Sequence, residues 1–391
     1  MIRVLVVEDS PTVREFLLQV LRADPAIEVI GVAESGEAAL AAVERTRPDV
    51  VTMDVHMPRM NGYDATRRIM ESHPTPIVIV SGTTDVTDTA RAFHAIEAGA
   101  LAVLPRPAGF GHAEHQRSAS ELLRTVKLMS EVKVVKRWPR VRAPEMASSL
   151  SAYPQDLAPL PEHSQIRLVA IGASTGGPPA IQKILSQLPR DFPAPVLIVQ
   201  HIAAGFTQGF VDWLAQSSNL PMQPPVQGAV PLMGHVYVAP DGMHMGLGPR
   251  GRLELSDAAP ENGQRPAVSY LFRSVAKIYG SSTAGVLLTG MGKDGSRELL
   301  EMREHGAVTI AQDRDSSVVF GMPGEAIKMG GAVYVLPPQK IGPALTGLVL
   351  GPVPAMVNEN PKAHLPAVEN RHDIAPEITH GPRRGNLVGG E

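Results

Sequence analysis

Residues 50–62 read VVTMDVHMPRMNG, an apolar run that ends at Asp54 and passes into a short loop. Comparable apolar runs recur through the N-terminal third of the chain, separated by amphipathic helical patterns; they cover residues 4–7, 29–33, 50–53, 77–80 and 101–104. Each run is too apolar to keep one face in water, which is typical of strands buried in a parallel sheet. Five such alternations predict a doubly wound α/β domain over residues 1–125.

A second alternation of strands and helices begins at residue 168. Its apolar runs cover residues 168–171, 196–199, 236–238, 286–288 and 333–336, with helical patterns at 181–188, 268–278 and 298–303. This rhythm predicts another α/β domain with a mainly parallel sheet, over residues 166–350. Residues 126–165 lose the periodicity and are rich in basic residues and then in Pro, Ser and Ala, so we expect an interdomain linker there. Residues 351–391 are expected to form a disordered tail.

The composition of the whole chain excludes several classes of protein. A length of 391 residues with 43% apolar content is enough for two globular domains and a connector. Cysteine is absent, which removes disulfides and thiolate zinc sites. A net charge of −3 argues against a nucleic-acid partner, because such proteins need a cationic surface. No apolar run approaches the ~20 residues of a membrane span, so we expect a cytoplasmic protein without membrane insertion.

Acidic residues follow two of the predicted N-terminal strands. Glu8 and Asp9 end the first strand, and Asp54 ends the third. The carboxyl ends of parallel strands converge on one edge of a sheet, and crowded carboxylates there repel one another unless a hard cation such as Mg²⁺ lies between them. The trio predicts a Mg²⁺ site, with Asp54 as a nucleophile toward a phosphate donor. An isolated Asp at such a position commonly caps a turn. Ser81, after the fourth strand, could bind a phosphoryl oxygen.

Residues 1–125 resemble the receiver domain of two-component response regulators, which has a flavodoxin-like doubly wound fold. The resemblance implies that Asp54 accepts a phosphoryl group from a histidine kinase and that Ser81 belongs to the phosphate switch. One position departs from the family pattern, because receivers carry a lysine before a proline at the end of the fifth strand and this chain has Arg106. Arginine has a planar guanidinium in place of the compact ammonium of lysine. We therefore expect Arg106 to contact phosphate but to have a different effect on signalling.

Residues 172–177 read GASTGG and connect the predicted strand 168–171 to the helical pattern 181–188. Small residues around a serine at such a turn let the backbone bend sharply and leave the Ser174 hydroxyl beside helix N-terminal N–H groups, which could stabilise an oxyanion. A phosphate-binding loop is the competing interpretation. The segment lacks the G-x-G-x-x-G spacing and the P-loop lysine, so a nucleophile is favoured.

A serine nucleophile needs a positioned base. His201 is the best placed, because it ends the strand 196–200 at the edge that Ser174 occupies. His235 precedes a strand and should lie at the opposite edge, and His305 closes a helix, where histidine complements the helix dipole. The position of His244 does not exclude it.

A third element, residues 290–295 (GMGKDG), follows the apolar run 286–288. Asp294 could be the N-cap of a helix that starts near Ser296. Because Asp294 again follows a strand's carboxyl end, we favour a triad in which it orients His201 and His201 takes the proton from Ser174. Donors for the oxyanion would come from the Thr175 hydroxyl or from backbone N–H groups around Met291.

The segments AIGASTGG (170–177), VQH (199–201), LTGMGKDG (288–295) and VVFGMPGEAI (318–327) resemble, in this order, the chemotaxis protein-glutamate methylesterase (CheB) family. The resemblance implies a C-terminal Rossmann-like methylesterase domain with Ser174, His201 and Asp294 as its triad and no cofactor for the esterase reaction. It implies hydrolysis of glutamate γ-methyl esters on methyl-accepting chemoreceptors, usually with glutamine deamidation. It further implies that the unphosphorylated receiver covers the esterase cleft and that phosphorylation opens it.

Two alternatives stay open from the sequence. One is a serine hydrolase that acts on a substrate other than receptors. The other is a response regulator with a non-enzymatic output domain that binds DNA or protein, for which the basic stretch 133–142 would be a contact surface. Pro139 interrupts that stretch and no helix-turn-helix pattern accompanies it, which favours a linker.

Overall fold

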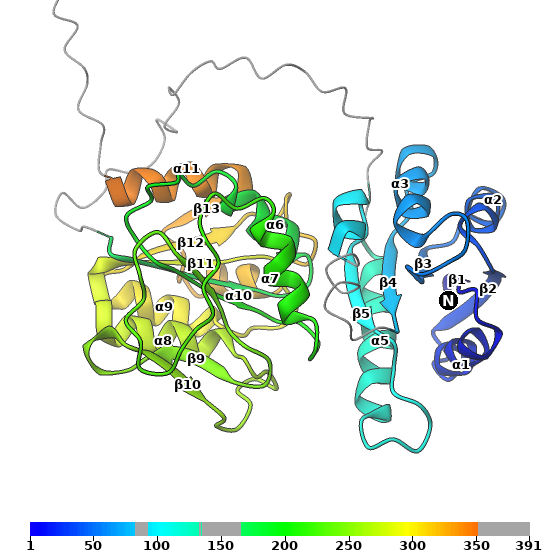
Figure 1. Ribbon diagram of the computed structural model, residues 1–391, viewed down its shortest axis with the longest axis horizontal. Coiled ribbons are helices and arrows are strands. Elements are labelled where there is room, and N and C mark those ends of the chain that lie inside the picture. Colours follow the sequence, from blue (N-terminus) through cyan, green and yellow to red (C-terminus); the bar gives the residue numbers. More distant parts are fainter. Residues whose placement is uncertain (83–92, 133, 135–165, 351–391) are drawn as a thin grey trace, which may run out of the picture. The chain divides into compact units, whose positions relative to one another are not determined.

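The computed structural model describes residues 1–82, 93–132, 134 and 166–350 (Figure 1). The predicted tail and, of the predicted linker, residues 133 and 135–165 lie outside these residues.

The N-terminal domain is a five-stranded parallel sheet with the strand order β2-β1-β3-β4-β5. Its strands are β1 (Ile2–Val7), β2 (Ile27–Ala33), β3 (Val50–Met53), β4 (Ile77–Ser81) and β5 (Ala102–Pro105). Its helices are α1 (Pro11–Arg22), α2 (Gly36–Thr46), α3 (Gly62–Ser72) and α5 (His115–Ser130). This order confirms the predicted doubly wound, flavodoxin-like fold. The last helix runs five residues past the predicted boundary at residue 125.

Both faces of this sheet are covered by helices, which explains why its strands are apolar throughout. Alternate strand residues such as Leu5 and Met53 pack in one core with α2 and α3, and Val4 and Val78 pack on the opposite face with α1 and α5. The register of β1 against β3 places Val7 opposite Met53, so the residues that follow these two strands emerge side by side.

The C-terminal domain contains a six-stranded parallel sheet, order β13-β12-β11-β6-β7-β8, and a separate antiparallel pair, β9 and β10. The strands are β6 (Leu168–Ala173), β7 (Val196–Gln200), β8 (Val236–Val238), β9 (His244–Leu247), β10 (Leu253–Ser256), β11 (Thr283–Leu287), β12 (Val308–Gln312) and β13 (Tyr334–Leu336). The helices are α6 (Gly177–Leu185), α7 (Thr207–Ala215), α8 (Val268–Tyr279), α9 (Ser296–Glu304), α10 (Met322–Lys328) and α11 (Pro338–Leu350). The parallel α/β prediction is confirmed. The sequence patterns did not predict β12, the β9–β10 pair, or α7, α10 and α11.

The sheet is built outward from β6 in both directions: β7 and β8 follow on one side, and β11, β12 and β13 follow on the other. Ala173 lies opposite Gln200, and Gly172 lies opposite Leu287. The helices α6 and α11 cover one face of this sheet and α8 and α9 the other. The loops after β6, β7 and β11 therefore meet at one rim, at the switch point where open α/β sheets bind ligands.

Among the described residues, no helix has the length and apolar character needed to cross a membrane.

Candidate functional site

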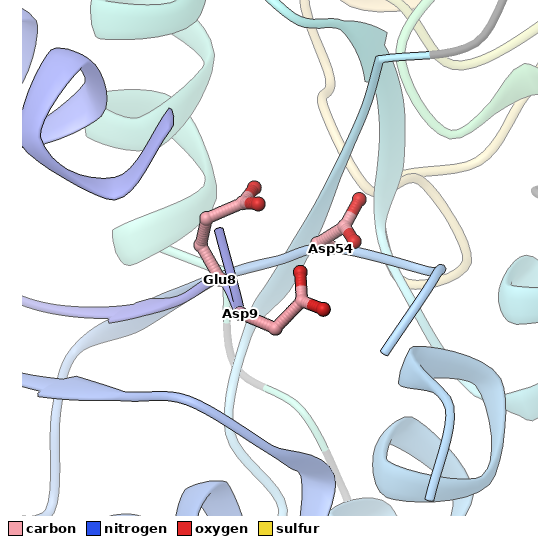
Figure 2. Close-up of side chains that lie close together, drawn as sticks. All are labelled: Glu8, Asp9 and Asp54. Carbon is pink, nitrogen blue, oxygen red and sulfur yellow. The ribbon is translucent and has the colours of Figure 1, made fainter. Parts of the chain in front are cut away.

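The N-terminal domain brings its three predicted carboxylates together. Oxygen atoms of Glu8, Asp9 and Asp54 all lie within 4.8 Å of one another at the strand ends (Figure 2). Asp54 also forms the local turn contact that its position allowed, because its Oδ2 accepts a hydrogen bond from the backbone N–H of His56 at 3.0 Å. Asp54 therefore takes part in the local turn and in the acidic cluster at the same time.

The electrostatics of this cluster fit a cation. Burial raises the pKa of Glu8 to about 7, with a further rise from the charge of Asp54 and an opposing effect from Arg106. Burial also raises the pKa of Asp54, against the charge of Arg106. Buried carboxylates at this separation are stabilised by a hard divalent ion with oxygen ligands, so the donor set present suits Mg²⁺.

Ser81 and Arg106 lie beside the acidic cluster. Arg106 Nη2 is 3.5 Å from Glu8 Oε2, a long ion pair. A Cβ built on Gly82 would lie 2.6 Å from the Arg106 guanidinium carbon, so the guanidinium lies directly on this glycine. Among the described residues, the buried Ser81 Oγ and Arg106 Nε have no hydrogen-bond partner. Unpaired buried polar atoms are costly, and phosphoryl oxygens would suit both.

In the C-terminal domain, Ser174 follows β6 at a sharp turn. Its N–H donates to Thr289 O at 3.0 Å, and its carbonyl accepts from the N–H of Gly177 at 2.8 Å. Gln200 Nε2 donates both to Ser174 O at 2.8 Å and to His201 O at 2.9 Å. This buried amide ties the backbones of the predicted nucleophile and base together.

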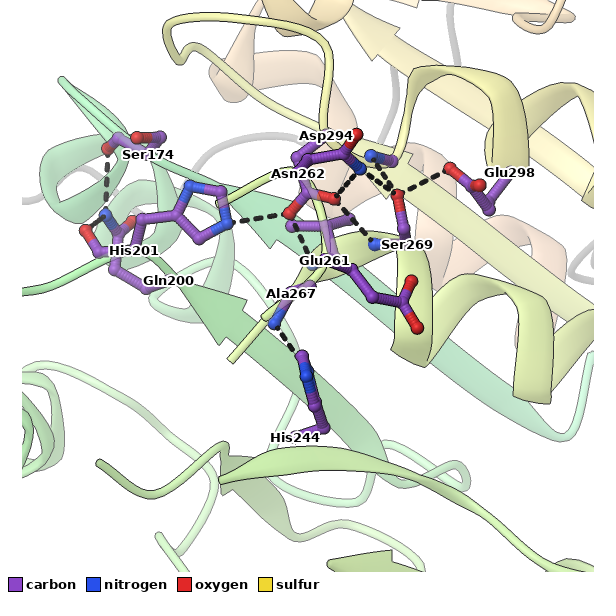
Figure 3. A network of polar contacts seen from close by, with 12 residues as sticks. Ser174, Gln200, His201, His244, Glu261, Asn262, Ala267, Ser269, Asp294 and Glu298 are labelled. Atoms are coloured by element: carbon purple, nitrogen blue, oxygen red, sulfur yellow. Dashed lines mark hydrogen bonds and ion pairs between the residues drawn. The ribbon is translucent and has the colours of Figure 1, made fainter. Parts of the chain in front are cut away.

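His201 and Asp294 form a close pair. His201 Nε2 lies 2.8 Å from Asp294 Oδ2 (Figure 3). The carboxylate also accepts from the N–H groups of Val268 at 2.7 Å and Ser269 at 3.1 Å, the first two residues of α8. Burial raises the pKa of Asp294, but the bond and charge of His201, with bonds from Ser269 and Asn262, lower it to about 2. Asp294 is therefore ionised at neutral pH.

The alternative role of Asp294 as a helix cap is not supported. The N-cap of α9 is Gly295, and no side chain caps that helix. The carboxylate turns instead toward the N-terminus of α8.

The remaining contact of the predicted triad, between Ser174 and His201, is open. No hydrogen bond between the Ser174 hydroxyl and the His201 ring is found in the described part of the chain, although Figure 3 shows Ser174 on the side of the ring away from Asp294. A histidine that donates from Nε2 to a carboxylate has an Nδ1 lone pair, which leaves Nδ1 as the nitrogen that can accept a proton. Such contacts are often long without substrate.

One group of predicted oxyanion donors, the N–H groups at the start of α6, needs a correction. Residues 178 and 179 of α6 are prolines without N–H groups, and the N–H of Gly177 is bonded to Ser174 O, so the first turn of α6 offers no free donor. The N–H groups of Thr175 and Met291 have no acceptor among the residues described here. These two N–H groups are available for an oxyanion, although the donor predicted at Thr175 was its hydroxyl.

The other histidines take the places that sequence position indicated. His235 precedes β8, and His305 follows α9 with its ring at the Glu301 carbonyl. His244, which sequence position left open, is fully buried and bonds through both ring nitrogens to backbone atoms of Ala259 and Ala267. It therefore has no free nitrogen for proton transfer.

Three polar residues of this rim were missed by the sequence analysis. Gln200 lies between two predicted catalytic loops, and Asn262 and Ser269 contact the Asp294 carboxylate. Only Gln200 has a sequence signal, since it directly precedes His201 at a strand end. Asn262 is remote in sequence from Ser174, His201 and Asp294.

An acidic cluster on a doubly wound sheet, followed by a second α/β domain with a serine at a strand-to-helix turn, defines a class of protein: a response regulator whose output domain is an enzyme. Residues 4–114 match the response regulator receiver domain model and residues 169–345 match the CheB methylesterase model.

Relatives identify the family. A protein-glutamate methylesterase/protein-glutamine glutaminase of Nitrosospira multiformis is 56% identical over 89% of this chain and 97% of its own length. A second, from Geobacter metallireducens, is 56% identical over 90% of this chain and 99% of its own. The Thermotoga maritima CheB methylesterase catalytic domain is 41% identical over 47% of this chain and 98% of that domain, with a TM-score of 0.46. The chain belongs to the protein-glutamate methylesterase/protein-glutamine glutaminase family, and the prediction of a carboxylic ester hydrolase is confirmed.

Proposed function

We propose that this protein removes methyl groups from glutamate γ-methyl esters of chemoreceptors and deamidates receptor glutamines, using Ser174, His201 and Asp294, and that phosphorylation of Asp54 activates it. The observation that carries the catalytic assignment is the buried 2.8 Å pair of His201 and Asp294 at the sheet rim where Ser174 emerges. We also propose a cytoplasmic location and, because α5 ends at Ser130, a domain division at residues 1–130, 131–165, 166–350 and 351–391.

In the first half-reaction, His201 Nδ1 takes the proton of the Ser174 hydroxyl as the oxygen attacks the ester carbonyl. Asp294 stays ionised and stabilises the imidazolium that forms. The tetrahedral intermediate collapses when the C–O bond to the methoxy group breaks, and the imidazolium returns its proton so that methanol leaves. A glutamine side chain follows the same course with ammonia as the leaving group.

In the second half-reaction, water attacks the acyl-enzyme ester. His201 accepts a proton from the water and then donates it to the Ser174 oxygen, which frees the glutamate product. The backbone N–H groups of Thr175 and Met291 would stabilise the oxyanion in both steps. Each such donor contributes roughly 2.7 to 4 kcal/mol to transition-state stabilisation.

In the receiver, Asp54 attacks the phosphoryl group on the phosphorylated histidine of a histidine kinase. Glu8, Asp9 and Asp54 would hold Mg²⁺, which supplies charge neutralisation for the phosphoryl oxygens. Ser81 Oγ and the Arg106 guanidinium would then bind those oxygens, since both have unpaired atoms beside the cluster. A phosphoryl group adds about −1.5 to −2 charges, enough to reorder the segments that bear Ser81 and Arg106.

The test is methanol release from membranes that carry methyl-labelled chemoreceptors. We expect wild type to release label, a phosphodonor to increase the rate, and Ser174→Ala to stop release with or without phosphodonor. A serine hydrolase for another substrate would hydrolyse a generic ester but leave these receptors methylated. Release by Ser174→Ala at the wild-type rate would place the nucleophile elsewhere.

A further inference from the structure

A tight turn lies beside the catalytic pair. Glu261 and Gln264 exchange two backbone hydrogen bonds, of 3.0 and 2.8 Å, around Asn262 and Gly263. Both central residues are left-handed, with φ of 51° and 76°. This is the geometry of a two-residue type I′ turn, for which Asn-Gly is a preferred pair. Local turn chemistry alone therefore explains why these residue types occur here.

The side chain of Asn262 makes contacts that the turn does not require. Its Nδ2 donates to Asp294 Oδ1 at 3.0 Å and to Ser269 Oγ at 3.0 Å (Figure 3). The Asp294 carboxylate thus has two donors on each oxygen. His201 and the N–H of Val268 bind Oδ2, whereas Asn262 and the N–H of Ser269 bind Oδ1.

This arrangement fixes how the carboxylate faces the histidine. Two donors on Oδ1 resist rotation of the carboxylate about its Cβ–Cγ bond, so Oδ2 stays directed at His201 Nε2. Without the amide of Asn262, Oδ1 keeps one backbone donor, and a buried carboxylate that loses a partner is less stable in its charged form.

The hydroxyl of Ser269 is also fixed. It donates to Glu298 Oε2 at 2.7 Å, so its lone pairs are left to accept from Asn262 Nδ2 and from the N–H of Gly295 at 3.0 Å. The amide of Asn262 is therefore held at both the carboxylate and the hydroxyl.

His244 holds the base of the turn. Its Nδ1 accepts from the N–H of Ala267 at 3.2 Å, which leaves Nε2 to donate to Ala259 O at 3.2 Å. Its ring stacks on Tyr270 with centroids 4.8 Å apart. The segment between its two backbone partners carries Asn262, so a buried neutral histidine anchors both ends of the segment.

We propose that Asn262 is a positioning residue for the catalytic pair, delivered by the type I′ turn and acting through Asp294 on His201; the inference rests on the proposed function. Titratable and charged groups on the turn and the elements around it include His201, His244, Tyr270 bonded to Glu254, Glu261 paired with Arg273, Arg265 bonded to the Asp257 carbonyl, Glu298 bonded through Ser269, and Lys293 next to Asp294 in the sequence.

Two substitutions remove the amide and keep the turn. Gly and Asp both occupy this turn position readily, so Asn262→Gly deletes the donor and Asn262→Asp replaces it with a second carboxylate. We expect both variants to keep the thermal midpoint within a few degrees, and kcat to fall about tenfold or more with KM unchanged. For Asn262→Asp we also expect the acidic limb of log kcat/KM against pH to move to higher pH, because added negative charge favours the protonated imidazole.

Gly263→Asn is the matched control. It alters the neighbouring turn position and spares the Asn262 amide. An added Cβ there meets no atom within 4 Å, and Asn tolerates the left-handed φ of 76° at this position better than most residues. We expect its kcat and pH profile to match wild type. Wild-type kcat and pH profiles for both Asn262 variants would overturn the inference, and so would a Gly263→Asn loss equal to theirs. Turnover by Ser174→Ala in the same assay would instead overturn the proposed function.

Discussion

Replacing Asp294 by Asn should nearly abolish turnover without removing any volume from the site. The carboxylate accepts four hydrogen bonds, two on each oxygen, and an Asn amide can accept on only one side. If its NH₂ group faces His201, the ring must accept at Nε2 and carry its proton on Nδ1, the nitrogen that should take the Ser174 proton. If the NH₂ group takes the place of Oδ1 instead, it faces the Asn262 and Ser269 donors and can accept from neither. Loss of the correct tautomer lowers kcat by ~10⁴-fold in serine hydrolases of this design.

The same substitution should change how stability depends on pH. The folded pKa of Asp294 is about 2, below the ordinary value of 3.8. Ionised Asp294 therefore stabilises the fold above pH 4 by roughly 2.5 kcal/mol, and this contribution is lost as the pH falls toward 2. We expect the difference in unfolding free energy between wild type and Asp294→Asn to shrink by about that amount between pH 5 and pH 2.

The assay is urea unfolding of both proteins across this pH range, with methanol release measured on the same preparations. A stability difference independent of pH would show that the fold does not favour ionised Asp294. A variant that keeps more than a tenth of wild-type kcat would refute its role in orienting His201.

Four further outcomes are expected. Asp54→Asn should abolish stimulation by a phosphodonor and spare basal methanol release; persistent stimulation would place the acceptor elsewhere. Arg106→Lys should sharpen the response to phosphodonor, because a compact ammonium replaces the planar guanidinium, and superimposable activation curves would show that the departure is harmless. Deletion of residues 1 to about 150 should raise basal turnover, although full gating would need ~5.5 kcal/mol; an unchanged rate in a folded truncation would reject inhibition by the receiver. Gly177→Ala should lower kcat about tenfold or more, because its Cβ would lie 2.1 Å from Gln200 Oε1 and displace that side chain. Wild-type kinetics for this variant would mean that Gln200 does not hold the nucleophile loop.

The strand-end residues were predictable because parallel strands impose a common edge. Once the apolar runs were recognised, Glu8 and Asp54 had to emerge near one another, and the same reasoning applied to His201 and Ser174.

Other site residues depend on contacts that no local pattern encodes. Asn262 lies in an ordinary turn signature, and only the fold shows its amide at the carboxylate of Asp294. His244 could not be excluded from sequence position, because its burial and backbone partners depend on the unpredicted β9–β10 pair. The expected helix N-terminal donors are missing because Pro178 and Pro179 lie in the first turn of α6 and have no N–H groups.

The most direct test of the proposed triad is a double-mutant cycle on methanol release. Ser174→Ala, His201→Ala and the double variant would be compared with wild type on methyl-labelled receptors. Residues that act as one unit give strongly non-additive losses, so the double variant should be no slower than Ser174→Ala alone. Losses that multiply, or turnover retained by either single variant, would contradict a shared proton transfer between these two side chains.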